Sequence, residues 1–286
     1  MSNDTYCGRR FVFPALILAS MAAEPMSNRL GADDTETSSA KPAIAKRVTE
    51  TTRSDGVKVS SKHPLAPAVS AAVSSLGTLE KITDYSATFT KREQIKGQLS
   101  KSVMDLKVRL EPFSVYLKYT EPHAGREVLY VDGQNKGNLL VHEEGIKSLA
   151  GTLALSPTGD QVLKENRHPV TEIGMHTMLD ILLKQWELEA KYSEISVKQS
   201  EEKVGDVECK VFEATHPQQR AHFKFHKTRL FISLETNLPV RLEQIGFPTK
   251  SGDTAPVVEE YTYSSIKTNI GLTDQDFDRK NKSYRF

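Results

Sequence analysis

The chain has 286 residues, a formal net charge of +1 and 38% apolar residues, which is typical of a soluble globular protein with one or two hydrophobic cores. Its basic residues are scattered among nearly as many acidic ones, so the sequence offers neither a basic surface nor an acidic tail. We therefore expect no nucleic-acid partner.

The first residues, 1–22, have the pattern of an export signal peptide. Arg9 and Arg10 precede the apolar segment 11–23, which offers small residues for cleavage after Ala22. A span of this length is too short for the roughly 20 apolar residues that cross a bilayer. We expect an exported protein of the periplasm or cell envelope, peripheral to the membrane at most. The route, general secretory or twin-arginine, stays open.

Residues 23–63 contain no aromatic side chain and are rich in Ser, Thr, Asp, Glu and Lys. Such a composition cannot bury enough apolar surface to offset the entropy of ordering, which predicts a disordered linker. The folded domain is then 64–286. It begins with a helix in which Val69, Val73 and Leu76 recur at helical spacing.

After Tyr85 the pattern changes to strands, separated by turns that contain Gly, Pro or Asn. The predicted strands cover 85–94, 102–110, 113–120, 127–131, 138–143, 193–199, 207–214, 221–226, 229–235, 238–244 and 257–267. One amphipathic helix interrupts them, and we expect Thr171 to be its N-cap. Its apolar stripe consists of Met175, Met178, Leu179, Leu182, Leu183 and Trp186. Ten or eleven strands with two main helices predict an α+β fold with a large curved antiparallel sheet.

The strands 113–120 and 127–131 carry bulky apolar residues on both faces. Phe113, Val115, Leu117 and Tyr119 share one face, whereas Tyr116 lies on the other. A sheet packed on a single core should alternate more cleanly between apolar and polar residues. We therefore expect something to cover each face of this part of the sheet.

The sequence contains no phosphate loop, dinucleotide fingerprint, nucleophile elbow or zinc motif. We interpret His222 and His226 as exposed histidines of one strand, with His216 nearby, rather than as metal ligands. The acidic residues of 274–278 resemble a calcium loop, but Arg279 replaces the required glycine. We expect no metal, no cofactor and no catalytic residue.

Several segments resemble known families. RLEPFSVYLKYTEP, VLYVDG and NLLVHEE are similar to the strand series of the LolA-like lipoprotein carriers. The motifs DYSATFTKREQIKG, GREVLYVDG, RHPVTEIG and EEYTYSSIKTNIGLTDQDFD resemble those of DUF1571, an uncharacterised family of exported bacterial proteins, across nearly all of 64–286. The resemblance implies an incomplete β-barrel covered by helices, with an apolar hollow for acyl chains. One departure is Glu111, where the carriers have an arginine.

Two groups of residues are candidates for a site in such a hollow. The apolar group that we expect to bind ligand is Phe113, Val115, Leu117, Tyr119, Leu129, Val131, Met178, Leu179, Leu182 and Trp186. The polar group, to which we assign no role, is Arg92, Glu93, Arg126, Glu127, Arg167 and His168.

The leading hypothesis is a non-enzymatic binding protein of the cell envelope that holds a lipid or a lipoprotein acyl chain. The alternative is an envelope sensor or interaction module with a filled interior, to which an envelope protein binds from outside. A third hypothesis is a hydrolase that uses His168 or His123 with a nearby acid. A continuous cavity of about 300 to 1,000 Å³ would favour binding, and a filled interior would not.

Overall fold

The computed structural model describes residues 57–250 and 252–286. The predicted export signal and residues 23–56 of the predicted linker lie outside the described residues. The chain divides into two units, Met1–Ala43 and Ile44–Phe286, and every element below belongs to the second.

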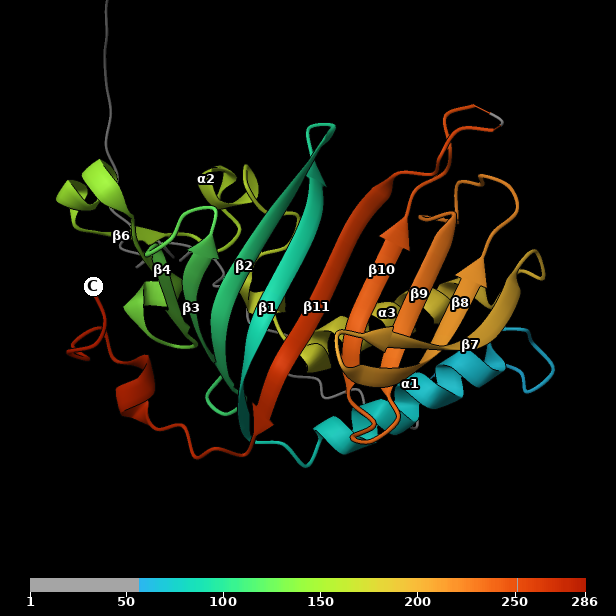
Figure 1. Ribbon diagram of the computed structural model, residues 1–286, viewed down its shortest axis with the longest axis horizontal. Helices are drawn as coiled ribbons and strands as arrows, with labels where there is room; N and C mark the ends of the chain where they lie inside the picture. The colour runs from blue at the N-terminus through green and yellow to red at the C-terminus, as the bar shows by residue number, and fades with distance from the viewer. Residues whose placement is uncertain (1–56, 251) are drawn as a thin grey trace, which may run out of the picture. The chain divides into compact units, whose positions relative to one another are not determined.

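The described residues form one antiparallel sheet of eleven strands with the order β6-β5-β4-β3-β2-β1-β11-β10-β9-β8-β7 (Figure 1). The strands are β1 (Asp84–Ile95), β2 (Gln98–Arg109), β3 (Ser114–Glu121), β4 (Glu127–Val131), β5 (Leu139–His142), β6 (Thr152–Leu155), β7 (Ser196–Val204), β8 (Val207–Thr215), β9 (Lys227–Ser233), β10 (Pro239–Ile245) and β11 (Val257–Thr268). The first and last strands pair in the middle and join two meanders, β1 to β6 and β7 to β11. Because β6 and β7 are edges that do not meet, the curved sheet stays open, which confirms the predicted class.

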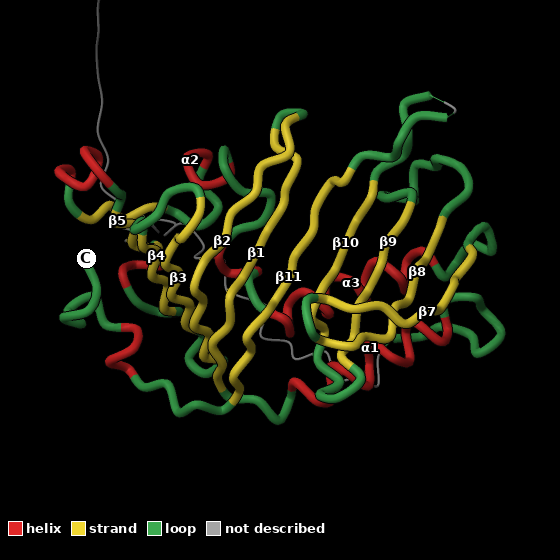
Figure 2. The backbone as a smooth tube through the Cα atoms, in the orientation of Figure 1, coloured by secondary structure: helices red, strands yellow, loops and turns green. Residues whose placement is uncertain are grey.

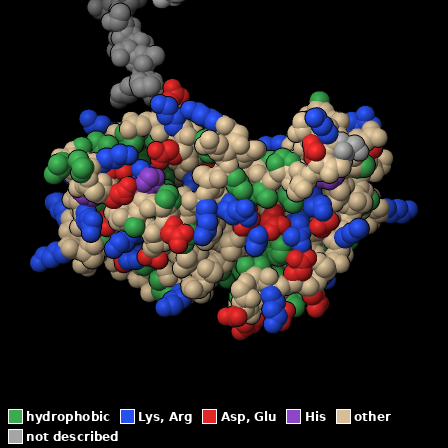
Figure 3. All heavy atoms as spheres, turned by 45° about the horizontal axis from the view of Figure 1, so that its top comes forward, with side chains coloured by type: hydrophobic (Ala, Val, Ile, Leu, Met, Phe, Trp, Pro, Cys, Tyr) green, Lys and Arg blue, Asp and Glu red, His purple; other side chains and the backbone are tan. Residues whose placement is uncertain are grey.

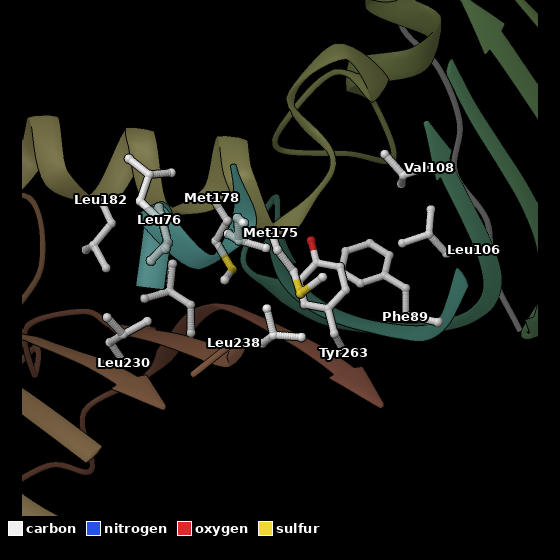
Figure 4. Packing of buried hydrophobic residues seen from close by; sticks show 14 of the residues in the cluster. Leu76, Phe89, Leu106, Val108, Met175, Met178, Leu182, Leu230, Leu238 and Tyr263 are labelled. Atoms are coloured by element: carbon white, nitrogen blue, oxygen red, sulfur yellow. The ribbon is translucent and has the colours of Figure 1, made fainter. Parts of the chain in front are cut away.

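Short helices and two longer ones accompany the sheet (Figure 2). They are α1 (Ala66–Leu79), α2 (Asp160–Leu163), α3 (Met175–Glu189) and the 3₁₀ turns η2 (Asn135–Gly137), η3 (Gly145–Ala150), η4 (Val170–Glu172) and η5 (Asp274–Phe277). The inner face of the sheet is the face that α1 and α3 cover. There the main hydrophobic core joins both helices to strands of both meanders. Figure 4 shows Leu76 of α1 and Leu182 of α3 above Leu230 of β9 in this core.

The folded part starts before the predicted boundary at residue 64. Val57 and Val59 pack against the main core, and a ring nitrogen of His63 lies 2.9 Å from the carbonyl of Tyr192. Residues 57–63 of the predicted linker therefore belong to the fold. Their composition is polar overall, but two valines are enough to hold a short segment against an existing core.

Helix α3 begins at Met175, and its N-cap is Gly174 rather than the predicted Thr171, which lies in η4. Gly174 has φ 121°, a conformation that side-chain-bearing residues rarely adopt. The Met175 N–H donates to the hydroxyl of Tyr85 at 3.1 Å, so a residue of β1 satisfies one of the free donors at the start of the helix. The predicted apolar stripe of the helix is buried throughout.

The outer face of β3, β4 and β5 is covered by the C-terminal segment 270–286. Phe277 is buried in a second hydrophobic cluster, and the rings of Tyr116 and Tyr284 stack with their centroids 4.0 Å apart. Lys107 of β2 donates to Asp276 at 2.8 Å, which fixes η5 against the sheet. Apolar residues on both faces of β3 and β4 are thus explained by the inner core and by this segment.

On the outer face of the other strands, charged side chains are paired. Arg92 of β1 lies 2.8 Å from Glu260 of β11, and Arg229 of β9 lies 2.9 Å from Glu243 of β10. Basic and acidic side chains are accordingly interspersed on the visible surface in Figure 3, with no large region of one sign.

The predicted strand at 221–226 is wrong. This segment belongs to an irregular loop, 216–226, whose ends are joined by a hydrogen bond from the His216 N–H to the His226 carbonyl at 2.8 Å. His222 is exposed as predicted, His226 is half-buried, and the neighbouring His216 is fully buried. The alternation in this segment comes from Phe223 and Phe225, which are both buried without a strand partner. Among the described residues, no group of three or more His, Cys, Asp or Glu side chains is arranged to hold a metal ion.

Candidate functional site

A cavity of about 160 Å³ lies between the inner face of the sheet and the segment that connects β6 to α3. We call residues 160–173 of this segment the roof. The apolar lining residues are Phe89, Met104, Leu117, Tyr119, Val128, Leu139, Val141, Leu155, Val162, Val170, Ile173, Met178, Ile181, Leu182, Leu242, Tyr261 and Tyr263. They come from the first meander, from the roof, from α3, and from β10 and β11.

The wall of the cavity changes from aromatic to charged along β1 and β11. Phe89 lies opposite Tyr263, and their stacked rings have centroids 4.9 Å apart. Four residues further along β1, or about 13 Å, Glu93 lies opposite Glu259, which in turn pairs with Gln244 of β10. We call Glu93, Glu259 and Gln244 the polar row. The cavity therefore has an apolar end and a polar end.

At the polar end, charged groups are paired out of contact with bulk water. Lys91 Nζ lies 3.0 Å from Glu93 Oε2 and also contacts the amide oxygen of Asn166 in the roof. The hydroxyl of Tyr261 donates to Glu93 Oε1 at 2.8 Å. The side chain of Glu93 is only 2% exposed, so these partners replace its lost hydration.

The roof is attached to the polar row by two cationic side chains. Arg167 Nε donates to Glu259 at 2.8 Å, and His168 contacts Glu259 at 3.1 Å and Glu172 at 2.8 Å. Burial alone would lower the pKa of His168, but the two carboxylates outweigh it and raise that pKa to about 9. Burial alone would raise the pKa of Glu259, but His168 and Arg167 hold it below its usual value. His168 is therefore protonated near neutral pH.

A second attachment lies where the cavity meets solvent. Arg126 donates from Nε to Glu143 at 2.9 Å and from a terminal nitrogen to Glu165 of the roof at 2.8 Å. Its guanidinium lies 5.5 Å from the ring centroid of Tyr119. The side chain of Arg126 is 7% exposed and that of Glu165 is 60% exposed, so this ion pair marks the outer edge of the roof.

The structure divides the predicted apolar residues into three groups. Leu117, Tyr119, Met178 and Leu182 line the cavity. Phe113, Val115, Leu179 and Trp186 are buried in the main core away from it.

Leu129 and Val131 lie in the second cluster on the outer face, so their predicted place in the hollow is wrong. Successive residues of a strand point to opposite faces, and the inner positions of β4 are Val128 and Tyr130.

The predicted polar residues are divided in the same way. Glu93, Arg126 and His168 line the cavity, and Arg167 completes their network. Arg92 instead pairs with Glu260 on the outer face, and a carboxylate oxygen of Glu127 accepts from the Arg285 N–H at 2.9 Å.

Sequence reasoning missed most of the lining residues, including Lys91, Gln244, Glu259 and Tyr261 at the polar end. For Lys91, Glu259 and Tyr261, the sequence did contain a signal, which is their position in the alternating pattern of the strands. Lys91 and Glu93 follow Phe89 at intervals of two, and Glu259 and Tyr261 precede Tyr263 in the same way, which puts charged groups on an otherwise apolar face.

The open sheet, the two covering helices and the cavity beneath the roof define an α+β half-barrel protein. The sequence matches the family described as "Protein of unknown function (DUF1571)" over residues 82–286, and the chain belongs to this family. No curated protein matches the chain. Within the described residues, none of the helices has the length and apolar composition needed to cross a bilayer.

The solved structures that are similar to this one include the following three. Lipoprotein LppX of Mycobacterium tuberculosis has 15% identity, with 74% of this chain and 99% of that chain covered and a TM-score of 0.42. LprF of Mycobacterium bovis has 10% identity, 74% and 97% coverage and a TM-score of 0.39. A LolA superfamily protein of Nitrosomonas europaea has 15% identity, 73% and 97% coverage and a TM-score of 0.27.

Proposed function

We propose that this protein is a non-enzymatic binding protein of the cell envelope that holds an acyl chain of a lipid or lipoprotein in the cavity beneath the roof. The observation that supports the proposal is the graded wall, aromatic at Phe89 and Tyr263 and charged at Glu93 and Glu259. Such a wall matches a molecule with an apolar tail and a polar end. The proposal requires no metal and no cofactor.

The size of the cavity adds a condition. An engineered cavity of about 150 Å³ accepts benzene, so a cavity of about 160 Å³ has room for about six carbon atoms. Burying six methylenes would contribute about 5 kcal/mol, against an association cost of about 4 to 15 kcal/mol. The closed cavity is therefore too small for useful affinity, and binding requires the roof to move or the lining side chains to rearrange. Met104 and Met178 are the most adaptable of these.

The same volume favours the second candidate, an interaction module whose interior is almost filled. The cavity falls below the range of about 300 to 1,000 Å³ that is usual for ligand sites. In this case the roof would stay closed, and an envelope protein would be the partner on the outside.

The geometry gives no support to the hydrolase hypothesis. A general base must be unprotonated near the working pH, whereas Glu172 and Glu259 raise the pKa of His168 to about 9 against the opposing effect of burial. His123 lies 2.9 Å from Glu144, but neither residue lines the cavity.

The envelope location depends on the pattern of residues 1–22, which lie outside the described residues. It stays a prediction.

Acyl-chain binding can be tested by placing a larger side chain in the cavity from strand β5. Val141 of β5 lines the cavity, whereas its neighbour Leu140 lies in the second cluster on the outer face. We expect Val141→Phe to weaken the binding of monolaurin, because the larger side chain occupies space in the cavity that the acyl chain needs. The expected loss is at least about tenfold in calorimetric titration, which corresponds to about 1.4 kcal/mol.

Leu140→Phe is the matched control and should leave the binding unchanged once folding is verified by circular dichroism. Equal affinity in the wild type and both variants would place the acyl chain elsewhere, and no binding at all would favour the interaction module.

A further inference from the structure

The charged residues that line the cavity define which polar end it can accept, and this inference rests on the proposed function. Among the described residues, the lining includes five carboxylates and three cationic side chains. The carboxylates belong to Glu93, Glu143, Glu165, Glu172 and Glu259, and the cations to Lys91, Arg126 and His168. Arg167, which donates to Glu259 without lining the cavity, adds a fourth cation, so the carboxylates outnumber the cations by one.

Each of these cations is already paired. Lys91 lies 3.0 Å from Glu93, and Arg126 uses two nitrogens for two different carboxylates, at 2.9 and 2.8 Å. His168 has a carboxylate on each ring nitrogen, at 2.8 and 3.1 Å. A carboxylate or phosphate of a ligand would have to displace one of these buried partners and leave it uncompensated, which is unfavourable.

One hydrogen-bond acceptor at the polar end, in contrast, is unpaired among the described residues. The Gln244 side chain is buried and donates from Nε2 to Gln185 at 3.1 Å, while its Oε1 has no hydrogen-bond partner among the described residues. Gln244 lines the cavity and lies beside Glu259 in the polar row. Since a buried unpaired acceptor is costly, a ligand that donates a hydrogen bond to this oxygen would gain from it.

We propose that the ligand of this cavity is an acyl ester, amide or alcohol whose polar end carries no negative charge and donates hydrogen bonds to the polar row. Free fatty acids and anionic phospholipids are then poor ligands. The paired cations disfavour an anionic end, and the unpaired acceptor of Gln244 favours an end that donates a hydrogen bond.

The experiment compares ligands of one chain length on the full-length protein by calorimetric titration at neutral pH and low salt. Monolaurin and dodecanol carry uncharged hydroxyl groups, whereas laurate carries a carboxylate. We expect both hydroxyl ligands to bind at least about tenfold more tightly than laurate. Laurate that binds as tightly as monolaurin would overturn this inference and leave the proposed function intact, whereas no binding of any of the three would refute the proposed function.

A variant tests the cause of the selectivity. Glu165 is the most exposed of the five carboxylates, so Glu165→Gln should fold and leave Arg126 with one anionic partner in place of two. We expect the ratio of laurate to monolaurin affinity to rise several-fold. Gln244→Leu, which removes the free acceptor, should weaken monolaurin and leave laurate unchanged. Ratios equal to the wild type in both variants would show that these residues do not select the ligand.

Discussion

Glu189 and His216 form a buried acidic and basic pair at the C-terminal end of α3, away from the cavity. Their side chains are 1% and 0% exposed, and Glu189 Oε2 lies 3.5 Å from His216 Nε2. His216 Nδ1 lies 2.9 Å from the Phe225 carbonyl, so Nδ1 carries the hydrogen. Burial raises the pKa of Glu189 to about 7 against the opposing hydrogen bond from Gln185, and burial lowers the pKa of His216. Burial therefore favours the uncharged form of both side chains.

The pH dependence of stability follows from this pair. A pKa that is higher in the folded than in the unfolded state means that the folded protein binds the extra proton, so Glu189 favours folding at low pH and the benefit is lost as pH rises to about 7. We expect Glu189→Gln to be more stable than the wild type by roughly 2 to 3 kcal/mol at pH 8, and by much less at pH 5. Urea unfolding at both pH values measures this, and a difference that does not depend on pH would contradict it.

At the scale of single elements, the start of α3 depends on Gly174. Its φ is 121°, and an added Cβ would lie 3.1 Å from the hydroxyl of Tyr85, which accepts the first N–H of the helix. We expect Gly174→Ala to destabilise the protein by about 1 to 3 kcal/mol in urea unfolding.

Gly77 of α1 provides the matched control, since a Cβ there would meet nothing within 4 Å. Gly77→Ala should stabilise the protein by about 0.5 to 1 kcal/mol, because alanine favours a helix more than glycine does. If both substitutions raised the free energy of unfolding, or both lowered it, the role assigned to Gly174 at the helix start would be wrong.

The C-terminal segment is a second element whose contribution to stability can be tested. Phe277 is 3% exposed in the outer cluster against Leu129 and Leu140. We expect Phe277→Ala to cost about 3 to 5 kcal/mol, as for other buried phenylalanines. Ile270→Ala is the control, since Ile270 is 44% exposed and should change the free energy of unfolding by less than about 1 kcal/mol. Similar unfolding curves for the two variants would mean that the segment does not stabilise the sheet.

The sequence predicted an element well where the spacing of its apolar residues indicates how the element is buried. The buried stripe of α3 and the two-sided apolarity of β3 and β4 were both visible in the sequence. The patterns could not indicate which face of β4 is concave, because that depends on the C-terminal segment, which is distant in the sequence. The N-cap at Gly174 was also missed, because its reason lies in contact with Tyr85 of another strand.

At the scale of the whole molecule, the pairing of the first strand with the last creates the site. Glu93 and Glu259 are far apart in the chain, but they lie opposite each other because β1 pairs with β11. The roof then adds Arg167 and His168 from between the two meanders. No local pattern predicts this pairing, so Glu93 and His168 could be selected from their motifs but not recognised as parts of one network.

In the proposed function, ligand binding requires the roof to move or the lining side chains to rearrange. It is attached to the sheet by ion pairs and hydrogen bonds of Glu165, Asn166, Arg167 and His168. Separating an exposed ion pair costs little free energy, because water solvates both charges, whereas exposing a buried hydrophobic core costs much more. The side chain of Glu165 is 60% exposed, whereas those of Glu93 and Glu259 are 2% and 4% exposed, so we expect the Glu165 edge of the roof to separate from the sheet at a lower cost than the polar row.

The most direct test of acyl-chain binding is the dependence of affinity on chain length. Calorimetric titration with a series of monoacylglycerols would measure it on the full-length protein. If the roof opens, each methylene beyond about six should increase the affinity about fourfold, since burying it contributes about 0.8 kcal/mol. An affinity that stops increasing at about six carbons, or the absence of binding at every length, would show that the cavity stays closed and would contradict the account.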